Sequence, residues 1–211
     1  MQLICKVNMK YRKYLRLIIL APILMAFQCE DDSIDIIRFN SYKANVTAKK
    51  VFSINDTIWI KGSASAMAFN ETQGDSIFNE NTYADVVSIF KFITPEEHHN
   101  TEEAVNAFKI HLEKGMYSEF GPCEKSGIVL NAALENNNQF YSYKIGLIPT
   151  STGDFVIDFV DSDLQNAETN LAIAENYPIT RHPNQIGFSR CESLSWLYLE
   201  DSTTEFLFSV A

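Results

Sequence analysis

The chain has 211 residues, with 17 basic and 27 acidic side chains and a formal net charge of −10 at neutral pH. Five of the basic residues and none of the acids lie in residues 1–28, so the remaining 183 residues carry 12 bases against 27 acids, a net charge of −15. A surface this acidic repels nucleic acid and anionic lipid head groups, and it argues against any basic binding stripe.

The N-terminal segment is typical of an export signal. An apolar run at residues 17–27 follows five cations, Lys6, Lys10, Arg12, Lys13 and Arg16. A membrane-spanning helix needs roughly 18 to 20 apolar residues, so this run fits the apolar region of a signal peptide better. A buried N-terminal helix is the alternative, but five unpaired cations beside the run would be costly in a core.

The apolar run ends at Cys29, which follows Gln28 and precedes Glu30, Asp31 and Asp32. This arrangement resembles a bacterial lipoprotein signal, in which the cysteine thiol receives a diacylglycerol and cleavage makes the cysteine the first residue. The family prefers a small residue where Gln28 stands, so the match is to a relaxed motif. Acidic residues directly after the cysteine are similar to those of Bacteroidetes lipoproteins, where they direct export to the outer face of the outer membrane.

The resemblance implies three segments: a signal peptide at residues 1–28, an acidic tether at 29–35 and a single domain at 36–211. It also implies a cell-envelope protein that is lipid-anchored in the outer membrane and exposed at the cell surface. Acyl chains contribute about 0.8 kcal/mol per buried methylene, so two or three of them hold a domain at a bilayer without a spanning helix.

Along the domain, most periodic segments predict strands. In residues 51–65, Ile58 and Ile60 alternate with Trp59 and Lys61, and an Asn-Asp turn at residues 55–56 divides the segment into two strands. Residues 83–93 form a run rich in Val, Ile and Phe that Pro95 ends.

Two segments predict helices instead. In residues 102–114, Ala104, Val105, Phe108 and Leu112 recur at helical spacing before Gly115. Residues 164–177 predict a weaker helix.

The remaining segments predict two paired strands at residues 127–134 and 139–147, separated by an Asn-rich turn, and further strands at 153–160, 186–192 and 205–210. Short strands with frequent turn signals indicate a mainly β fold, an immunoglobulin-like or related β-sandwich with one or two inserted short helices. Segments at residues 55–60, 143–149, 153–157 and 186–191 resemble uncharacterised lipoproteins of flavobacteria. That resemblance implies no known activity.

The densest group of metal-ligand side chains is Glu96, Glu97, His98 and His99, with Glu102, Glu103 and His111 nearby. The spacing of a zinc-enzyme motif is missing, and a solvated loop explains the group better.

Carboxylates at Asp158, Asp161 and Asp163 could bind calcium, but an acidic loop is the ordinary explanation. The isolated His182 fits an exposed turn, and motifs for nucleophilic catalysis or phosphate binding are not found. We therefore expect no cofactor, no metal and no catalytic residue.

Aromatic side chains offer a second kind of site. Trp59, Trp196, Tyr141, Tyr143 and Tyr198 lie in or near predicted strands. On an exposed face they could stack on sugars, whereas core packing is the commoner use.

Four hydroxyl residues stand in Asp-Ser/Thr-containing triplets that resemble O-glycosylation sites of Bacteroidetes envelope proteins: Ser33, Thr57, Ser76 and Ser202. The leading functional hypothesis is a non-catalytic binding or scaffolding protein with a glycan or protein ligand. The alternative is a carbohydrate-active hydrolase that acts through paired carboxylates, or a glycan-binding accessory module.

The first prediction concerns lipidation at Cys29. Mass spectrometry of membrane-extracted protein is expected to find an acylated N-terminal Cys29 peptide, because the mature chain would begin there. Cys29→Ala is expected to release or mislocalise the domain. An intact leader on a soluble cytoplasmic protein would contradict the prediction.

The second prediction is a disulfide between Cys123 and Cys191. Cys5 lies in the leader and Cys29 carries the lipid, which leaves one pair in an oxidising envelope. Two free thiols are the alternative. A disulfide that closes the long loop between these cysteines lowers the entropy of the unfolded chain, which stabilises the fold by about 4 kcal/mol. Removal of the disulfide should therefore lower the melting temperature, while the lipid anchor at Cys29 is unaffected. Labelling of both thiols without reductant would show the prediction to be wrong.

Overall fold

The computed structural model describes residues 35–80, 82–119, 127–160, 162–165, 168–179, 185–190, 193–198 and 204–211. Residues Ile37–Ala211 form one compact unit. The sequence predictions at Cys29, Ser33, Cys123, Cys191 and Ser202 lie outside the described residues. Within the described ranges, no helix has both the length and the apolar character needed to cross a membrane.

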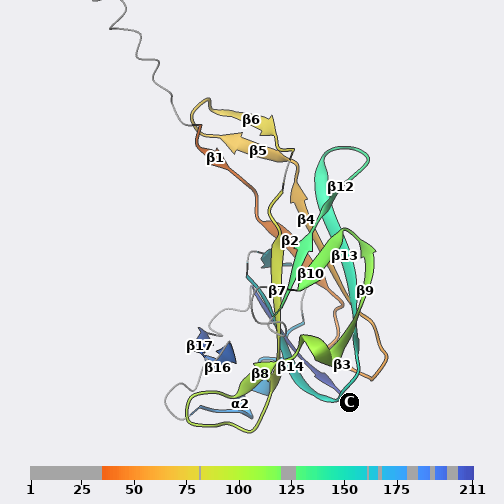
Figure 1. Cartoon of the computed structure of the whole chain (residues 1–211), viewed down its shortest axis with the longest axis vertical. Coiled ribbons are helices and arrows are strands. Elements are labelled where there is room, and N and C mark those ends of the chain that lie inside the picture. Colours follow the sequence, from red (N-terminus) through yellow and green to blue (C-terminus); the bar gives the residue numbers. More distant parts are fainter. Residues whose placement is uncertain are drawn as a thin grey trace, which may run out of the picture. The chain divides into compact units, whose positions relative to one another are not determined.

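One sheet of the compact unit has six strands among the described residues (Figure 1). Its order is β12 (Ala133–Leu134), β13 (Phe140–Pro149), β4 (Ile58–Ser65), β2 (Tyr42–Val46) and β15 (Ser162–Leu164), and β9 (Phe108–Lys114) also pairs with β13. All of these pairs are antiparallel except that of β15 with β2.

The other large sheet has nine strands in the described part of the chain. Its order is β17 (Ser193–Tyr198), β16 (Gln185–Arg190), β8 (Thr101–Glu103), β7 (Asp85–Phe92), β14 (Gly153–Phe159), β18 (Glu205–Val210) and β3 (Val51–Phe52). β11 (Gly127–Asn131) also pairs with β7, and β10 (Met116–Glu119) pairs with β11. A small sheet of β1 (Ile37–Arg38), β5 (Met67–Asn70) and β6 (Asp75–Phe78) stands apart from both.

The two large sheets share one apolar core, which confirms the predicted mainly β sandwich. The six-stranded sheet contributes side chains such as Ile58, Ile60 and Ile145, and the nine-stranded sheet contributes Phe155 and Phe208. These side chains are fully buried. Burying a large apolar side chain contributes roughly 1.5 to 3 kcal/mol, so this core is the main source of stability.

The nine-stranded sheet is buried on its second face as well. A smaller cluster there contains Phe90, Val156, Leu207 and Ile173, the last from the helix α2 (Ala172–Glu175). The central strands β7, β14 and β18 of this sheet are therefore buried at most of their positions. By contrast, β4 alternates strictly between buried and more exposed residues, because no apolar cluster of the described residues covers the outer face of β4.

A buried carboxylate links the two sheets inside the core. Asp85 on β7 accepts hydrogen bonds from the hydroxyls of Tyr143 on β13 and Ser162 on β15, the latter at 2.5 Å. Burial, followed by the negative charge of Asp85, raises the pKa of Tyr143 well above its ordinary value. Gly62 leaves room for the Tyr143 ring, since a Cβ at Gly62 would lie 2.2 Å from that ring.

The predicted helix at residues 102–114 is wrong. This segment forms β8, a short 3-10 helix η1 (Val105–Ala107) and β9, which pairs with β13 (Figure 1). Phe108 and Ile110 face the core at the two-residue spacing of a strand. The apolar residues of this segment therefore fit a strand as well as a helix, and backbone pairing with β13 selects the strand.

Three other expectations need correction: the length of one predicted helix and the pairing partners of two pairs of predicted strands. The helix predicted at residues 164–177 is reduced to the four residues of α2. The turn at Asn55 is present, with a φ of 71°, but β3 and β4 on its two sides belong to different sheets. Likewise, residues 127–134 divide between β11 in the nine-stranded sheet and β12 in the six-stranded sheet, and only β12 pairs with β13.

A third prediction follows from Glu205, which is 4 % exposed and lies directly opposite Asp158 on β14. Burial raises the pKa of Glu205 above its ordinary value, although hydrogen bonds from Thr204 and the backbone lower it in part. The protonated form is therefore favoured in the fold. The stability that protonated Glu205 contributes to the fold is fully present below its pKa in the unfolded chain, near 4.5. This stability is lost as the pH rises through the higher pKa of Glu205 in the folded protein.

Glu205→Gln is accordingly expected to raise stability at pH 7, on the order of 1 kcal/mol, and to flatten the rise in stability between pH 7 and pH 4.5. Thermal melts across that range measure both effects. The exposed Glu102→Gln is the matched control and should leave the pH dependence unchanged. A lower melting temperature for Glu205→Gln at pH 7 would contradict the prediction.

Candidate functional site

The outer face of the six-stranded sheet carries the candidate site. Alternation along β4 turns Ile58 and Ile60 into the core and leaves Trp59 and Lys61 on the opposite face. The same alternation on β2 leaves Asn45 outside. Register then places Asn45 opposite Lys61 and Lys61 opposite Lys144.

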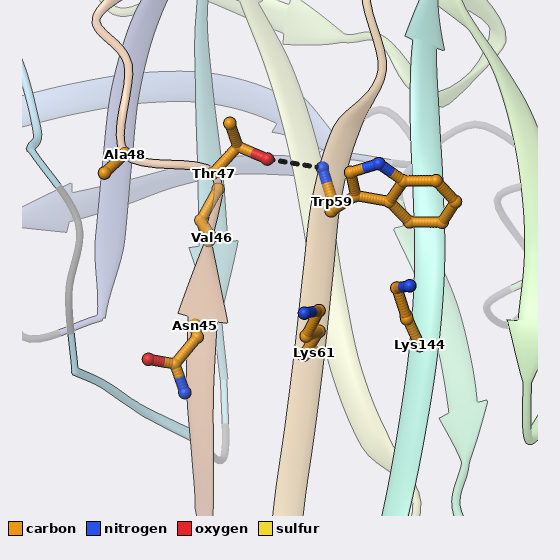
Figure 2. A pocket seen from close by; sticks show the side chains of 7 residues that line it. All are labelled: Asn45, Val46, Thr47, Ala48, Trp59, Lys61 and Lys144. Atoms are coloured by element: carbon orange, nitrogen blue, oxygen red, sulfur yellow. Dashed lines mark hydrogen bonds between the residues drawn. The ribbon is translucent and has the colours of Figure 1, made fainter.

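Two adjoining hollows lie on this face, which we call the β4 groove. One is lined by Asn45, Val46, Thr47, Ala48, Trp59, Lys61 and Lys144, as Figure 2 shows. The other shares Asn45, Lys61 and Lys144 and adds Gly62, Ser63, Lys114, Glu135, Ser142 and Tyr143. Their volumes are about 280 and 360 Å³. Small-molecule pockets range from roughly 300 to 1,000 Å³, so the two hollows lie at the lower end of that range.

Trp59 is the partly exposed aromatic side chain of the groove. Its backbone is fixed to Thr47 by two hydrogen bonds, one to the Thr47 hydroxyl at 2.9 Å and one from the Thr47 N–H at 3.0 Å. The indole extends over β13 (Figure 2). A Cβ added at Gly146 on that strand would lie 3.2 Å from a carbon of the indole ring. His111 packs edge-on at 5.8 Å between ring centres. Glycine at position 146 thus permits the indole to lie across the neighbouring strand.

Lysines form a row across three strands in the groove. Lys61 on β4 is opposite Lys144 on β13, and Lys144 is opposite Lys114 on β9. The Lys144 ammonium lies 2.5 Å from Glu113 and 4.4 Å from the centre of the Trp59 ring, and Lys114 pairs with Glu135 at 3.1 Å. The net charge of the chain argued against a basic stripe on the surface, and this row of three lysines is a local exception to that expectation.

Lys61 differs from the other lysines of the row. It is exposed, and its ammonium has no ion pair or hydrogen bond with any described residue. Asn45, the register partner of Lys61 on β2, also has a side-chain amide without a partner in the described part of the chain. Both groups can therefore donate hydrogen bonds to a ligand without first losing a contact within the protein.

Glu135 is the carboxylate that lines the groove among the described residues. It accepts a hydrogen bond from Ser142 at 2.8 Å, and this bond, together with Lys114, holds the pKa of Glu135 below its ordinary value. A glycosidase general acid requires a raised pKa, so Glu135 is poorly suited to that role.

The aromatic residues considered from the sequence separate into two groups. Tyr143 is buried in the core of the sandwich. Tyr141 is also buried but belongs to neither core cluster, and its hydroxyl donates to the Asn79 carbonyl at 2.8 Å. Trp59 is half-buried and Trp196 is exposed, and the Trp196 indole N–H donates to the His98 carbonyl at 3.2 Å. The side chain of Tyr198 is not among those the structure describes.

The acidic and histidine clusters do not form a metal centre within the described residues, where no group of three or more suitable ligands is found. His98 and His99 pair separately with Glu97 and Glu96, each at 3.5 Å. Asp163 pairs with Lys43, while Asp161 and His182 lie outside the described residues.

Two of the predicted glycosylation residues can be located. Ser76 is exposed on β6, whereas Thr57 is half-buried just before β4. The accessible hydroxyl of Ser76 makes it the better acceptor of the two.

Sequence reasoning identified Trp59 but missed Asn45, Lys61, Lys114 and Lys144 as neighbours of it. Alternation in residues 58–61 could have placed Lys61 on the face of Trp59. Nothing local could have found Lys114 and Lys144, because their positions depend on strand register.

Comparison of the chain with protein-family models, with curated proteins and with solved structures finds no match to any of them. What this face does must therefore follow from its own residues.

Proposed function

We propose that the protein is a non-catalytic glycan-binding protein of the cell envelope and that the β4 groove is its binding site. Lipid on Cys29 would hold the domain at the outer membrane, as the resemblance to bacterial lipoproteins implies. The domain would then present the outer face of its six-stranded sheet to ligands outside the membrane.

The observation that carries the proposal is the partly exposed indole of Trp59 at the edge of a hollow that polar side chains line in part. Aromatic faces stack on the C–H faces of pyranose rings, and polar groups nearby then fix the orientation of the sugar. Asn45 and Lys61 supply such donors next to the indole, and neither has a partner within the described protein. Strand pairing fixes the backbone positions of these residues, so their ordering on binding is confined to the side chains.

The alternative, a hydrolase acting through two carboxylates, finds less support. Such an enzyme places its carboxyl groups roughly 5 to 10 Å apart in a cleft. Among the described residues, one of the two hollows is lined by a single carboxylate, that of Glu135, and the other hollow by none. Glu135 is already engaged by Ser142 and Lys114.

The fourth prediction tests Trp59. The chain has two tryptophans, so Trp196→Phe leaves Trp59 as the single indole reporter. In this background, glycans that bind on an array are expected to change the fluorescence of Trp59. Trp59→Ala should weaken binding by about 30-fold or more, since a central aromatic anchor contributes about 2 kcal/mol.

Trp59→Phe retains a flat ring and is expected to bind only a few-fold more weakly than the original protein. Far-UV circular dichroism should show that all three variants remain folded, because Trp59 lies on the outer face of the sheet. Glycan binding that is unchanged in Trp59→Ala would exclude the groove as the site. Failure to bind any glycan would exclude the proposed function.

A further inference from the structure

We propose, building on the glycan-binding function above, that the β4 groove selects acidic polysaccharides, with a ring carboxylate of the sugar bound at Lys61 and Asn45. The inference concerns the class of sugar and rests on the lysine row, whereas the proposed function rests on Trp59.

The lysine row carries an energetic cost that ion pairs within the described protein offset only in part. Like charges directly opposite each other on neighbouring strands are destabilising, and Lys61 faces Lys144 in this way. Lys144 in turn is paired in register with Lys114. The residues after position 28 contain 12 bases among 183 positions, and three of these bases line one hollow.

Acidic side chains offset the row at one end only. Glu113 neutralises Lys144, and Glu135 neutralises Lys114. Lys61 lies at the other end, beside Asn45, and has no ion pair within the described residues. An anion bound there would gain a charge-assisted hydrogen bond from Lys61 and a second bond from the Asn45 amide.

The position of Trp59 relative to Lys61 favours a sugar acid over other anions. Two residues apart on one strand face, their Cα atoms are separated by about 7 Å. A uronic acid carries its carboxylate directly on the pyranose ring, so a ring stacked on Trp59 could reach Lys61 with that carboxylate. An acidic peptide would use the lysines but would leave the indole without a matching ring.

The acidic remainder of the surface does not prevent this contact. At physiological ionic strength the screening length is about 8 Å, so distant carboxylates act weakly while the groups that line the groove act at contact distance. The lysine row can thus attract an acidic sugar on a protein that repels polyanions elsewhere.

The fifth prediction is tested with polygalacturonate, alginate and hyaluronate, each compared with its carboxyl-reduced, neutral form. Calorimetry with the membrane-extracted mature chain in detergent, at fixed ionic strength, is expected to show binding of at least one acid at least tenfold tighter than its reduced form. Lys61→Gln should weaken binding of the acid by about tenfold and leave binding of the neutral form unchanged. Lys61→Arg retains the charge and should bind nearly as well as the original protein.

Lys91→Gln is the matched control, because it removes one lysine charge from β7 in the other sheet and should have no effect. All variants should melt at or above the temperature of the original protein, apart from Lys91→Gln, which loses a contact with the Phe155 ring. All three substitutions leave Trp59 itself in place.

Equal affinity for the acid and its neutral form, with Trp59 still required, would overturn this inference and leave the proposed function standing. Failure of all three acids to bind, while a neutral glycan binds through Trp59, would do the same. Absence of binding to any glycan, acidic or neutral, would refute the proposed function itself. Binding of polyglutamate as tight as that of the sugar acids, with the same loss in Lys61→Gln, would overturn the inference in favour of an acidic peptide.

Discussion

Phenyl rings and branched aliphatic side chains from two sheets meet in one core, and both sheets must present apolar residues to it. Phe155 stacks on Phe208 with ring centres 5.7 Å apart, and Ile58 and Ile145 complete the contact from the opposite sheet. Asp85 could not occupy this interior as a bare charge, because burial of an unpaired carboxylate is costly. Hydroxyls of Tyr143 and Ser162 from the facing sheet solvate it, so the carboxylate also aligns the two layers.

The two sheets differ in what covers their outer faces, and this difference positions the candidate site. Phe90, Val156 and Leu207 extend a second apolar cluster beyond the nine-stranded sheet, where α2 packs. The six-stranded sheet has polar residues on its outer face instead, so that face can carry ligand-binding groups without loss of core packing. A binding function there is compatible with a stable sandwich, because the two roles use opposite sides of the same strands.

Net charge describes the average surface and misses its local arrangement. The excess of acids indicated a protein without basic stripes, yet antiparallel pairing brings Lys61, Lys144 and Lys114 into one row. Within its own strand, no lysine of the row indicates that the other two are its neighbours. Gly146 is likewise not recognisable from its own segment as a neighbour of Trp59, because only strand pairing brings the indole across it.

Local sequence determined the features that depend on neighbouring residues. Alternation in residues 58–65 and 153–159 predicted strands correctly, as did the final apolar segment, and the mainly β sandwich followed from many such segments. Residues 108–112 fit both helical and strand periods, and pairing of β9 with β13 decided for the strand. The β4 groove could not be predicted for the same reason. Backbone hydrogen bonds between strands far apart in the chain set the register, and register alone places Asn45, Lys61 and Lys144 side by side next to Trp59.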